Sequence, residues 1–150
     1  MDQKIVDVTM SGNIIIFFDG YCILCNKIID FLIANDKKQK FLFASLQSKT
    51  ASKILDKIEY SNEKIKNLDN IVYFKNDTLQ IKSNAILTIL SDLGGIYQFT
   101  KIFYLIPLFL RDLIYDQIAI NRYKWFGKKT TCRIPNPDKS LFPPYAFTLH

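Results

Sequence analysis

Two cysteines three positions apart, Cys22 and Cys25, are the residues of this 150-residue chain best placed to do chemistry. They follow a run of β-branched and aromatic residues, Ile14–Phe18, and open an amphipathic segment, so we expect a strand-to-helix junction. In the first turn of a helix the two side chains share one face, within the ~4.4–6.8 Å Cα separation that an unstrained disulfide needs. The pair can therefore alternate between dithiol and disulfide.

Cys22 is the expected nucleophile of the pair. A helix N-terminus presents unpaired N–H groups and the positive end of the helix dipole, and both stabilise a thiolate. Helix N-termini and C-x-x-C spacing lower a thiol pKa from ~8.5 into roughly the 3.5–7.5 range. Cys25, one turn further in, is then the resolving thiol, which attacks a mixed disulfide on Cys22 and releases the reduced substrate. We expect neither a metal nor an organic cofactor.

Asp19 is a third candidate residue, three positions before Cys22. Its carboxylate can accept or relay a proton during exchange. It can also form an Asp-Gly turn with Gly20 and cap the helix through a side-chain oxygen. Because a nearby carboxylate raises a thiol pKa and so opposes the helix, we expect the turn or cap to be its main role.

Zinc binding and inert packing are the alternatives for the cysteines. A zinc site would use Cys22, Cys25 and Cys132, but a tetrahedral site needs four ligands. The C-terminal His150 is the remaining candidate, and it forms no closely spaced pair with Cys132. Two buried apolar cysteines would do no chemistry at all. The redox interpretation is the one that the position of the pair favours.

Composition and length predict one globular domain over residues 1–150. Hydrophobic residues make up 49% and charged residues 23%, which excludes a disordered, collagenous or coiled-coil chain. Three cysteines are too few for a disulfide scaffold. We expect a core over about 13–95, followed by a helical and basic extension over about 96–150.

The elements expected in the core have the order β-α-β-α-β-β-α. Strands are predicted at Ile14–Phe18, Phe41–Ser45, Ile71–Lys75 and Thr78–Lys82, the last two joined as a hairpin at Asn76-Asp77. Helices are predicted from Cys22 to about Asn35, over Ser48–Tyr60, and from an N-cap at Ser83 to Leu93 before Gly94-Gly95. A right-handed crossover makes the first two strands parallel, and helices cover both faces of a mixed α/β sheet. This is a thioredoxin-like arrangement.

The extension is predicted to hold two apolar helices, about 96–105 and 108–121, parted by Pro107, and then a loop-like tail from 122. Polar residues and Pro107 interrupt Ile96–Leu110, so we expect a buried or interfacial helix pair rather than a membrane span. The first apolar run is too short for a secretory signal. We therefore expect a cytoplasmic protein, in a compartment where close cysteines are more often catalytic or metal-binding than structural.

Most of the net charge of +6 lies at the C-terminal end, where residues 111–150 hold seven basic and three acidic groups. Cations and aromatic residues alternate over 121–133, and Gly127 is the expected end of a helix. Such a patch suits phosphates, anionic lipid or an acidic protein. It matches no RNA-recognition or helix-turn-helix pattern, so nucleic acid is not an expected partner. A redox-inactive module that docks a membrane protein or anionic surface through 96–133 is the alternative function.

The segment Asp19-Gly-Tyr-Cys-Ile-Leu-Cys-Asn26 resembles the D-x-x-C-x-x-C motif of the DCC family of thiol-disulfide oxidoreductases, a thioredoxin-like group. The resemblance continues through Phe43–Ser48, Arg111-Asp-x-x-Tyr115 and Asn121–Gly127, with Cys132 close behind. It covers the chain from 14 to about 135. It implies a thioredoxin-like fold and exchange with a protein or low-molecular-weight thiol or disulfide, without specifying the substrate.

The resemblance also implies supporting residues at both ends of the chain. Gly20 and Tyr21 belong to the N-terminal motif. Arg122 and Tyr123 belong to a segment that would fold over the C-x-x-C face, where Arg122 could hold the Cys22 thiolate and Cys132 could be a third redox thiol. The alternatives are a solvated basic helix end and one buried cysteine.

Overall fold

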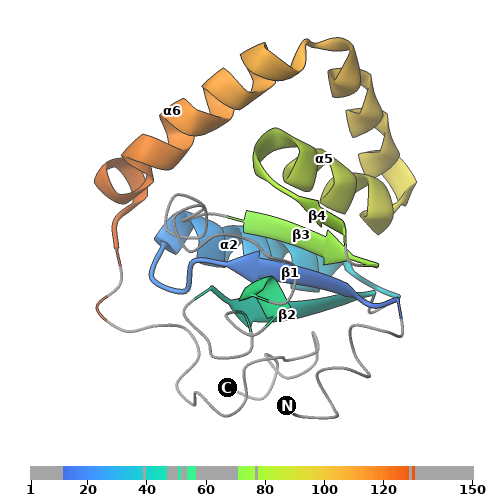
Figure 1. The fold of residues 1–150 in the computed structure, drawn as a ribbon, viewed down its shortest axis with the longest axis horizontal. Coiled ribbons are helices and arrows are strands. Elements are labelled where there is room, and N and C mark those ends of the chain that lie inside the picture. The colour runs from blue at the N-terminus through green and yellow to red at the C-terminus, as the bar shows by residue number, and fades with distance from the viewer. Residues whose placement is uncertain are drawn as a thin grey trace.

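The fold is built on a four-stranded mixed sheet with the strand order β2-β1-β3-β4 (Figure 1). The structure is a computed structural model and describes residues 12–38, 40–46, 51, 54–56, 71–76, 78–128 and 130. Its elements are β1 (Ile14–Phe18), α2 (Ile23–Asn35), β2 (Phe41–Ser45), β3 (Ile71–Lys75), β4 (Thr78–Gln80), α5 (Lys82–Leu93), the 3-10 helix η1 (Gly95–Leu105) and α6 (Leu108–Phe126).

The central strand β1 is buried along its whole length, as its continuous apolar run predicts. It pairs in parallel with β2 and antiparallel with β3, and β4 adds an antiparallel edge next to β3. The parallel pair and the hairpin are thus confirmed. The cysteines therefore follow the C-terminal end of this central strand, where α2 begins.

The side chains of β1 alternate between two layers, because successive residues of a strand point to opposite faces. Ile16 and Phe18 pack with residues of α2 and α5. Ile15 and Phe17 pack on the opposite face against a set that includes the helical residues Ala51, Ile54 and Leu55. Helices therefore cover both faces of the sheet, which confirms the thioredoxin-like fold class. The rest of the helix predicted over Ser48–Tyr60 lies outside the described residues.

The predicted N-cap of α5 is wrong. The cap position is Ile81, whose side chain makes no capping bond, and β4 ends at Gln80 because the helix begins at Lys82. The hydroxyl of Ser83 instead donates to the Asp112 carboxylate of α6, 2.5 Å away, and its backbone N–H donates to the same oxygen at 3.4 Å. A carboxylate from another helix therefore takes the place of the local cap.

The C-terminal helices form an arch that leaves α5 and crosses above the sheet (Figure 1). The helix expected over 96–105 is a 3-10 helix with no buried residue, so of the two alternatives, a buried or an interfacial pair, the buried one is wrong. The sheet face is already covered by α2 and α5, which leaves no core for η1 to enter. The start of the tail expected from 122 is also wrong, because α6 continues to Phe126 and ends at Gly127, and the tail beyond residue 130 lies outside the described residues. Among the described residues, no helix is long and apolar enough to cross a membrane.

Candidate functional site

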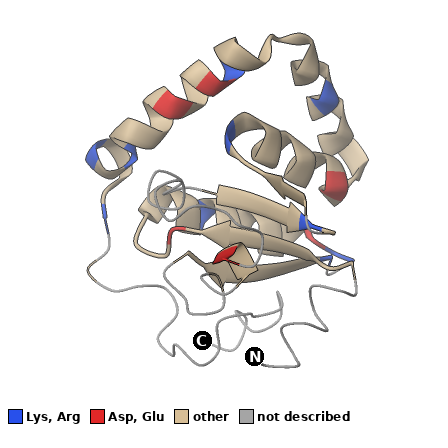
Figure 2. Cartoon of the chain, viewed as in Figure 1, with Lys and Arg blue, Asp and Glu red and all other residues tan. Residues whose placement is uncertain are grey.

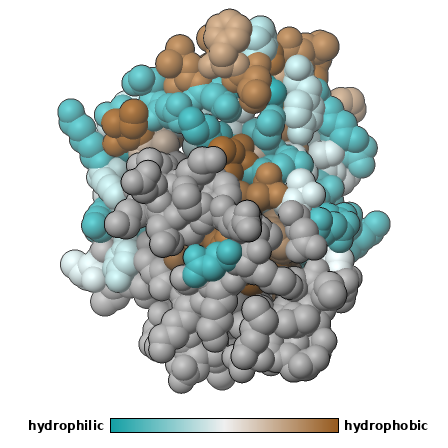
Figure 3. Space-filling model, viewed as in Figure 1, coloured by the Kyte–Doolittle hydropathy of each residue, from teal (hydrophilic) through white to brown (hydrophobic). Residues whose placement is uncertain are grey.

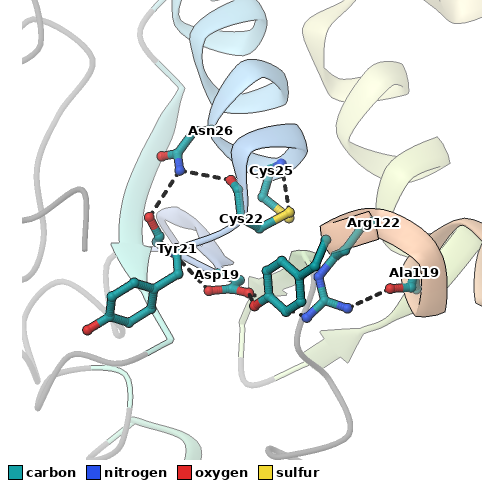
Figure 4. A network of polar contacts seen from close by, with 9 residues as sticks. Asp19, Tyr21, Cys22, Cys25, Asn26, Ala119 and Arg122 are labelled. Atoms are coloured by element: carbon teal, nitrogen blue, oxygen red, sulfur yellow. Dashed lines mark hydrogen bonds and ion pairs between the residues drawn. The ribbon is translucent and has the colours of Figure 1, made fainter. Parts of the chain in front are cut away.

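A tight turn connects β1 to α2 and holds the first residues of the site (Figure 4). The Cys22 N–H donates to the Asp19 backbone carbonyl at 3.3 Å, and the Tyr21 N–H donates to the Asp19 carboxylate at 3.0 Å. Asp19 therefore makes the predicted turn, with its side chain accepting a bond from two residues ahead. The helix cap expected of Asp19 is supplied by Cys22 instead.

Cys22 is the N-cap of α2, in an extended conformation with φ −79° and ψ 119°. Its Sγ accepts a hydrogen bond from the Cys25 backbone N–H, 3.2 Å away. The pKa of Cys22 is lowered to about 7, chiefly by a hydrogen bond from the Cys25 side chain, with help from this N–H and from the charge of Arg122. Burial and the Asp19 carboxylate oppose the shift. The donors outweigh them, so Cys22 is the more acidic thiol.

Cys25 behaves in the opposite way. Its pKa is raised well above the ordinary thiol value, first because its side chain donates to Cys22 and second because it is buried. The proton that stabilises the Cys22 thiolate is therefore held on Cys25. The two thiols differ as a nucleophile and a resolving group must differ.

Asn26 belongs to the site, although sequence reasoning assigned it no role. Its buried side-chain amide donates to the Gly20 carbonyl at 3.0 Å and to the Cys22 carbonyl at 2.8 Å. These two bonds tie the turn to the first turn of α2 (Figure 4). The sequence signal for this role was the position of Asn26 directly after Cys25. Its partners could not be predicted, because they are backbone carbonyls and every residue has one.

The end of α6 brings two further residues to the turn, as the resemblance implies. Arg122 forms an ion pair with Asp19, with 3.4 Å between Nη2 and Oδ2, and its Nη1 donates to the Ala119 carbonyl at 2.7 Å. The Tyr123 hydroxyl donates to the same Asp19 oxygen. The pKa of Tyr123 is raised to about 12, by burial and by this bond, so the phenol keeps the proton that it donates.

The chain after α6 lies over the cysteine pair. Gly127 ends the helix with φ 94°, and the next residue, Lys128, forms an isolated antiparallel bridge with Cys22. The Lys128 ammonium lies 5.9 Å from the Tyr21 ring centroid and 5.2 Å from that of Tyr123. Cys22 has no exposed surface in this arrangement, and Cys25 is 3% exposed. The thiol pair is therefore closed to solvent, with Lys128 bonded across Cys22.

The structure brings together Asp19, Gly20, Tyr21, Cys22 and Cys25 with Arg122 and Tyr123. Cys132 lies outside the described residues, as do Lys129 and Arg133, so its suggested role stays a prediction. Within the described ranges no three metal-ligating side chains form a group.

A C-x-x-C pair at the strand-to-helix junction of a mixed sheet covered by helices is the arrangement of a thioredoxin-like protein. Residues 16–128 match the family model of DCC1-like thiol-disulfide oxidoreductases, and the chain belongs to this family.

Two relatives share most of the chain. The uncharacterized protein YuxK of Bacillus subtilis (strain 168) is 36% identical over 133 residues, which are 88% of this chain and 95% of that protein. The chloroplastic DCC family protein At1g52590 of Arabidopsis thaliana is 33% identical over 121 residues, which are 80% of this chain and 69% of that protein. No solved structure matches the chain.

Proposed function

We propose that the chain catalyses thiol-disulfide exchange, with Cys22 as the nucleophile and Cys25 as the resolving thiol. The observation that supports this best is the hydrogen bond from the Cys25 N–H to Cys22 Sγ at the start of α2. A pKa of about 7 gives Cys22 a large thiolate fraction at neutral pH. It also preserves nucleophilicity, since the best attacking thiol has a pKa near the ambient pH.

The proposed reaction proceeds through one mixed disulfide. The Cys22 thiolate attacks one sulfur of the substrate disulfide, the substrate S–S bond breaks, and the other sulfur leaves as a thiolate that solvent protonates. Cys25 then loses its proton to solvent and attacks the Cys22 sulfur, the mixed disulfide bond breaks, and the second substrate sulfur leaves as a thiolate that solvent protonates. The substrate is reduced by two electrons, and the Cys22–Cys25 pair is oxidised to a disulfide. The reverse sequence oxidises a dithiol, and relative reduction potentials set the direction.

Asp19, Arg122 and Tyr123 act in this proposal as positioning residues. The charge of Arg122 lowers the pKa of Cys22, whereas Asp19 raises the pKa of both thiols. The Asp19 carboxylate accepts bonds from Tyr21, Tyr123 and Arg122. It is thus engaged by donors on both sides of the site, which favours a structural role over that of a proton carrier.

Exchange also requires the site to open. Because the Cys22 side chain has no exposed surface, a substrate sulfur reaches it only after the cover formed by residues 122–128 moves. We propose that substrate binding displaces this cover and that its return shields the oxidised pair.

The test is to oxidise the protein mildly and to count free thiols by the alkylation mass shift. We expect an intramolecular Cys22–Cys25 disulfide, formed equally by a Cys132→Ser control. Cys25→Ser should accumulate mixed disulfides with protein or low-molecular-weight thiols, whereas Cys22→Ser should not. If the two cysteines stay reduced while the fold is intact, the proposal is wrong.

A further inference from the structure

A cavity of about 480 Å³ lies beside the cysteine pair and is formed largely by the C-terminal helix. Residues of α2, β3, α5 and α6 line it, among them Cys25, Ile118, Arg122 and Trp125. The atoms that face the cavity are apolar. Its volume falls in the roughly 300–1,000 Å³ range of small-molecule sites.

Two residues connect this cavity to the proposed chemistry. Cys25 forms part of the wall, so a bound group would lie directly beside the thiol pair. Arg122 forms another part of the wall and also contacts Asp19 in the turn before Cys22. A movement of Arg122 that uncovers Cys22 would therefore join the cavity to the nucleophile.

The lining determines what the cavity can hold. A charged or strongly polar group would lose its hydration there without gaining a partner. Nη1 and Nη2 of Arg122 are engaged by the Ala119 carbonyl and by Asp19, and the surface that lines the cavity is apolar. An aromatic or branched aliphatic group would instead be removed from water against isoleucine, leucine and aromatic side chains, which is favourable.

We propose that the cavity binds the apolar group next to the sulfur that Cys22 attacks, so that the protein prefers disulfides flanked by large uncharged groups. This inference rests on the proposed exchange reaction and adds its substrate class. The group can come from a peptide or from a low-molecular-weight disulfide, since both present the same apolar surface.

Exchange kinetics test the preference. The substrates are glutathione mixed disulfides of a peptide with Phe and Leu beside its cysteine, of a peptide with Ser and Gly there, and of benzyl mercaptan. We expect kcat/KM to be roughly tenfold higher for the apolar compounds, since contacts of one or two methylenes change it about that much. If only the apolar peptide or only the benzyl compound is preferred, the result shows whether the bound apolar group comes from a peptide or from a low-molecular-weight disulfide. Equal values for all three would overturn the proposal.

A pair of variants on α6 locates the effect. Ile118→Ser removes an apolar side chain from the cavity wall, and the ratio between apolar and polar substrates should fall several-fold. Ile120→Ser makes the same change two residues away, at a side chain that is 75% exposed and does not line the cavity, so the ratio should persist. An equal loss in both variants would contradict the assignment.

The single tryptophan, Trp125, gives a readout that does not depend on activity. Binding of N-phenyl-1-naphthylamine in the cavity should quench its fluorescence by energy transfer, less in Ile118→Ser than in Ile120→Ser. Quenching without any exchange would contradict the proposed function and leave the cavity site standing. Exchange with no quenching and no substrate preference would overturn the cavity site alone.

A separate observation concerns the arch formed by η1 and α6, which exposes large apolar side chains (Figure 3). Ile96, Phe99, Leu105, Phe109 and Leu113 are each 55–83% exposed. Soluble monomers rarely leave an extended apolar patch uncovered, and such patches mark interaction sites. We call these five residues the arch surface.

The charges around the arch surface favour an anionic partner. Figure 2 shows acidic residues within α6, and these are Asp112 and Asp116. Both interact with α5: Asp112 accepts a hydrogen bond from the Ser83 hydroxyl, and Asp116 forms a 3.1 Å ion pair with Lys82. Lys101 and Lys124 are exposed on the same two helices. Lys101 lies between Phe99 and Leu105 in the chain and Lys124 lies beyond Leu113, and exposed apolar side chains accompanied by exposed cations suit the headgroup region of an anionic bilayer.

We propose that the arch surface docks onto an anionic lipid surface. The full chain should float with vesicles of phosphatidylcholine and phosphatidylglycerol, and not with phosphatidylcholine alone. Phe99→Ser combined with Phe109→Ser should abolish flotation. Lys101→Glu with Lys124→Glu should weaken it several-fold more than Lys37→Glu with Lys38→Glu, which changes the net charge equally. No flotation, or a concentration-dependent dimer that the two phenylalanine changes dissociate, would overturn the proposal.

Discussion

The carboxylate of Asp19 and the guanidinium of Arg122 form a buried ion pair although they are 103 positions apart in the chain. Asp19 begins the turn after β1, and Arg122 lies in the last turns of α6. Their side chains are 1% and 8% exposed. The pair therefore fastens the C-terminal helix to the turn before Cys22 and places one positive and one negative charge near the two thiols.

Removing Arg122 should cost both stability and thiolate character. Arg122→Met leaves the Asp19 carboxylate buried without its cation, which typically costs about 3–5 kcal/mol. It also removes a charge that lowers the pKa of Cys22, so this pKa should rise. Urea unfolding and the ultraviolet absorbance of the thiolate measure the two effects. Asp19→Asn added to Arg122→Met should recover part of the stability, and unchanged stability in the single variant would contradict the argument.

Cys25 should control the acidity of Cys22. The hydrogen bond from the Cys25 side chain is the largest cause of the lowered pKa, and Cys25→Ala removes it while keeping the backbone N–H. We expect the pKa of Cys22 to rise from about 7 towards the ordinary 9.0. Cys25→Ser, which retains a hydroxyl donor, should shift it less. Thiolate absorbance against pH gives the values, with Cys22→Ser as the blank. Equal pKa values in the parent and Cys25→Ala would refute this assignment.

The same shift should make the stability of the reduced protein depend on pH. Because the pKa of Cys22 is lower in the folded state, the unfolded state binds more protons between pH 7 and 9, and stability rises with pH in that window. The rise is at most about 3 kcal/mol for a shift of this size. The raised pKa of Cys25 removes stability only above about pH 9. Urea unfolding of the parent minus Cys22→Ser isolates the effect, and a flat difference would count against it.

Asn26 should matter for the geometry of the turn. Asn26→Leu has a similar volume but leaves the Gly20 and Cys22 carbonyls without their donor, and each lost buried partner costs about 1–3 kcal/mol. We expect lower stability together with slower Cys22–Cys25 disulfide formation. Asn35→Leu is the control, because its amide donates to the Phe31 carbonyl at the far end of the same helix and accepts from the Tyr97 hydroxyl, so its bonds do not involve the turn before Cys22. Similar losses in both variants would mean that Asn26 has no special role.

Local patterns were sufficient to predict the sheet and the placement of the cysteines. The runs Ile14–Phe18, Phe41–Ser45 and Ile71–Lys75 are strands with those bounds, because each is short, apolar and rich in β-branched or aromatic residues. The position of Cys22 follows from the end of the first run. These features depend on neighbours in the sequence.

Features that depend on distant contacts were harder to predict. Apolar content left open whether the helices after Gly95 are buried or interfacial, because burial depends on whether a sheet face is free, and α2 and α5 already occupy it. The cap at Ser83 failed because Asp112 competes for the hydroxyl. The approach of Arg122 to the turn came only from the family resemblance, since no periodicity relates residues so far apart.

Gly127 should be required for the cover over Cys22. Its φ of 94° is strained for any residue with a side chain, and a Cβ at this position would lie 3.1 Å from Cδ1 of Ile23, the first residue of α2. Gly127→Ala should therefore lower the free energy of unfolding by about 1 kcal/mol or more and loosen the bridge between Lys128 and Cys22. Alkylation of Cys22 by iodoacetamide should then become faster, because the thiol is closed off by this segment. Gly94→Ala, at a helix end with φ 78° and no atom closer than 3.9 Å, is the control: it should lose stability through backbone strain without exposing Cys22. If both variants react at the parent rate, residues 122–128 do not control access to the nucleophile.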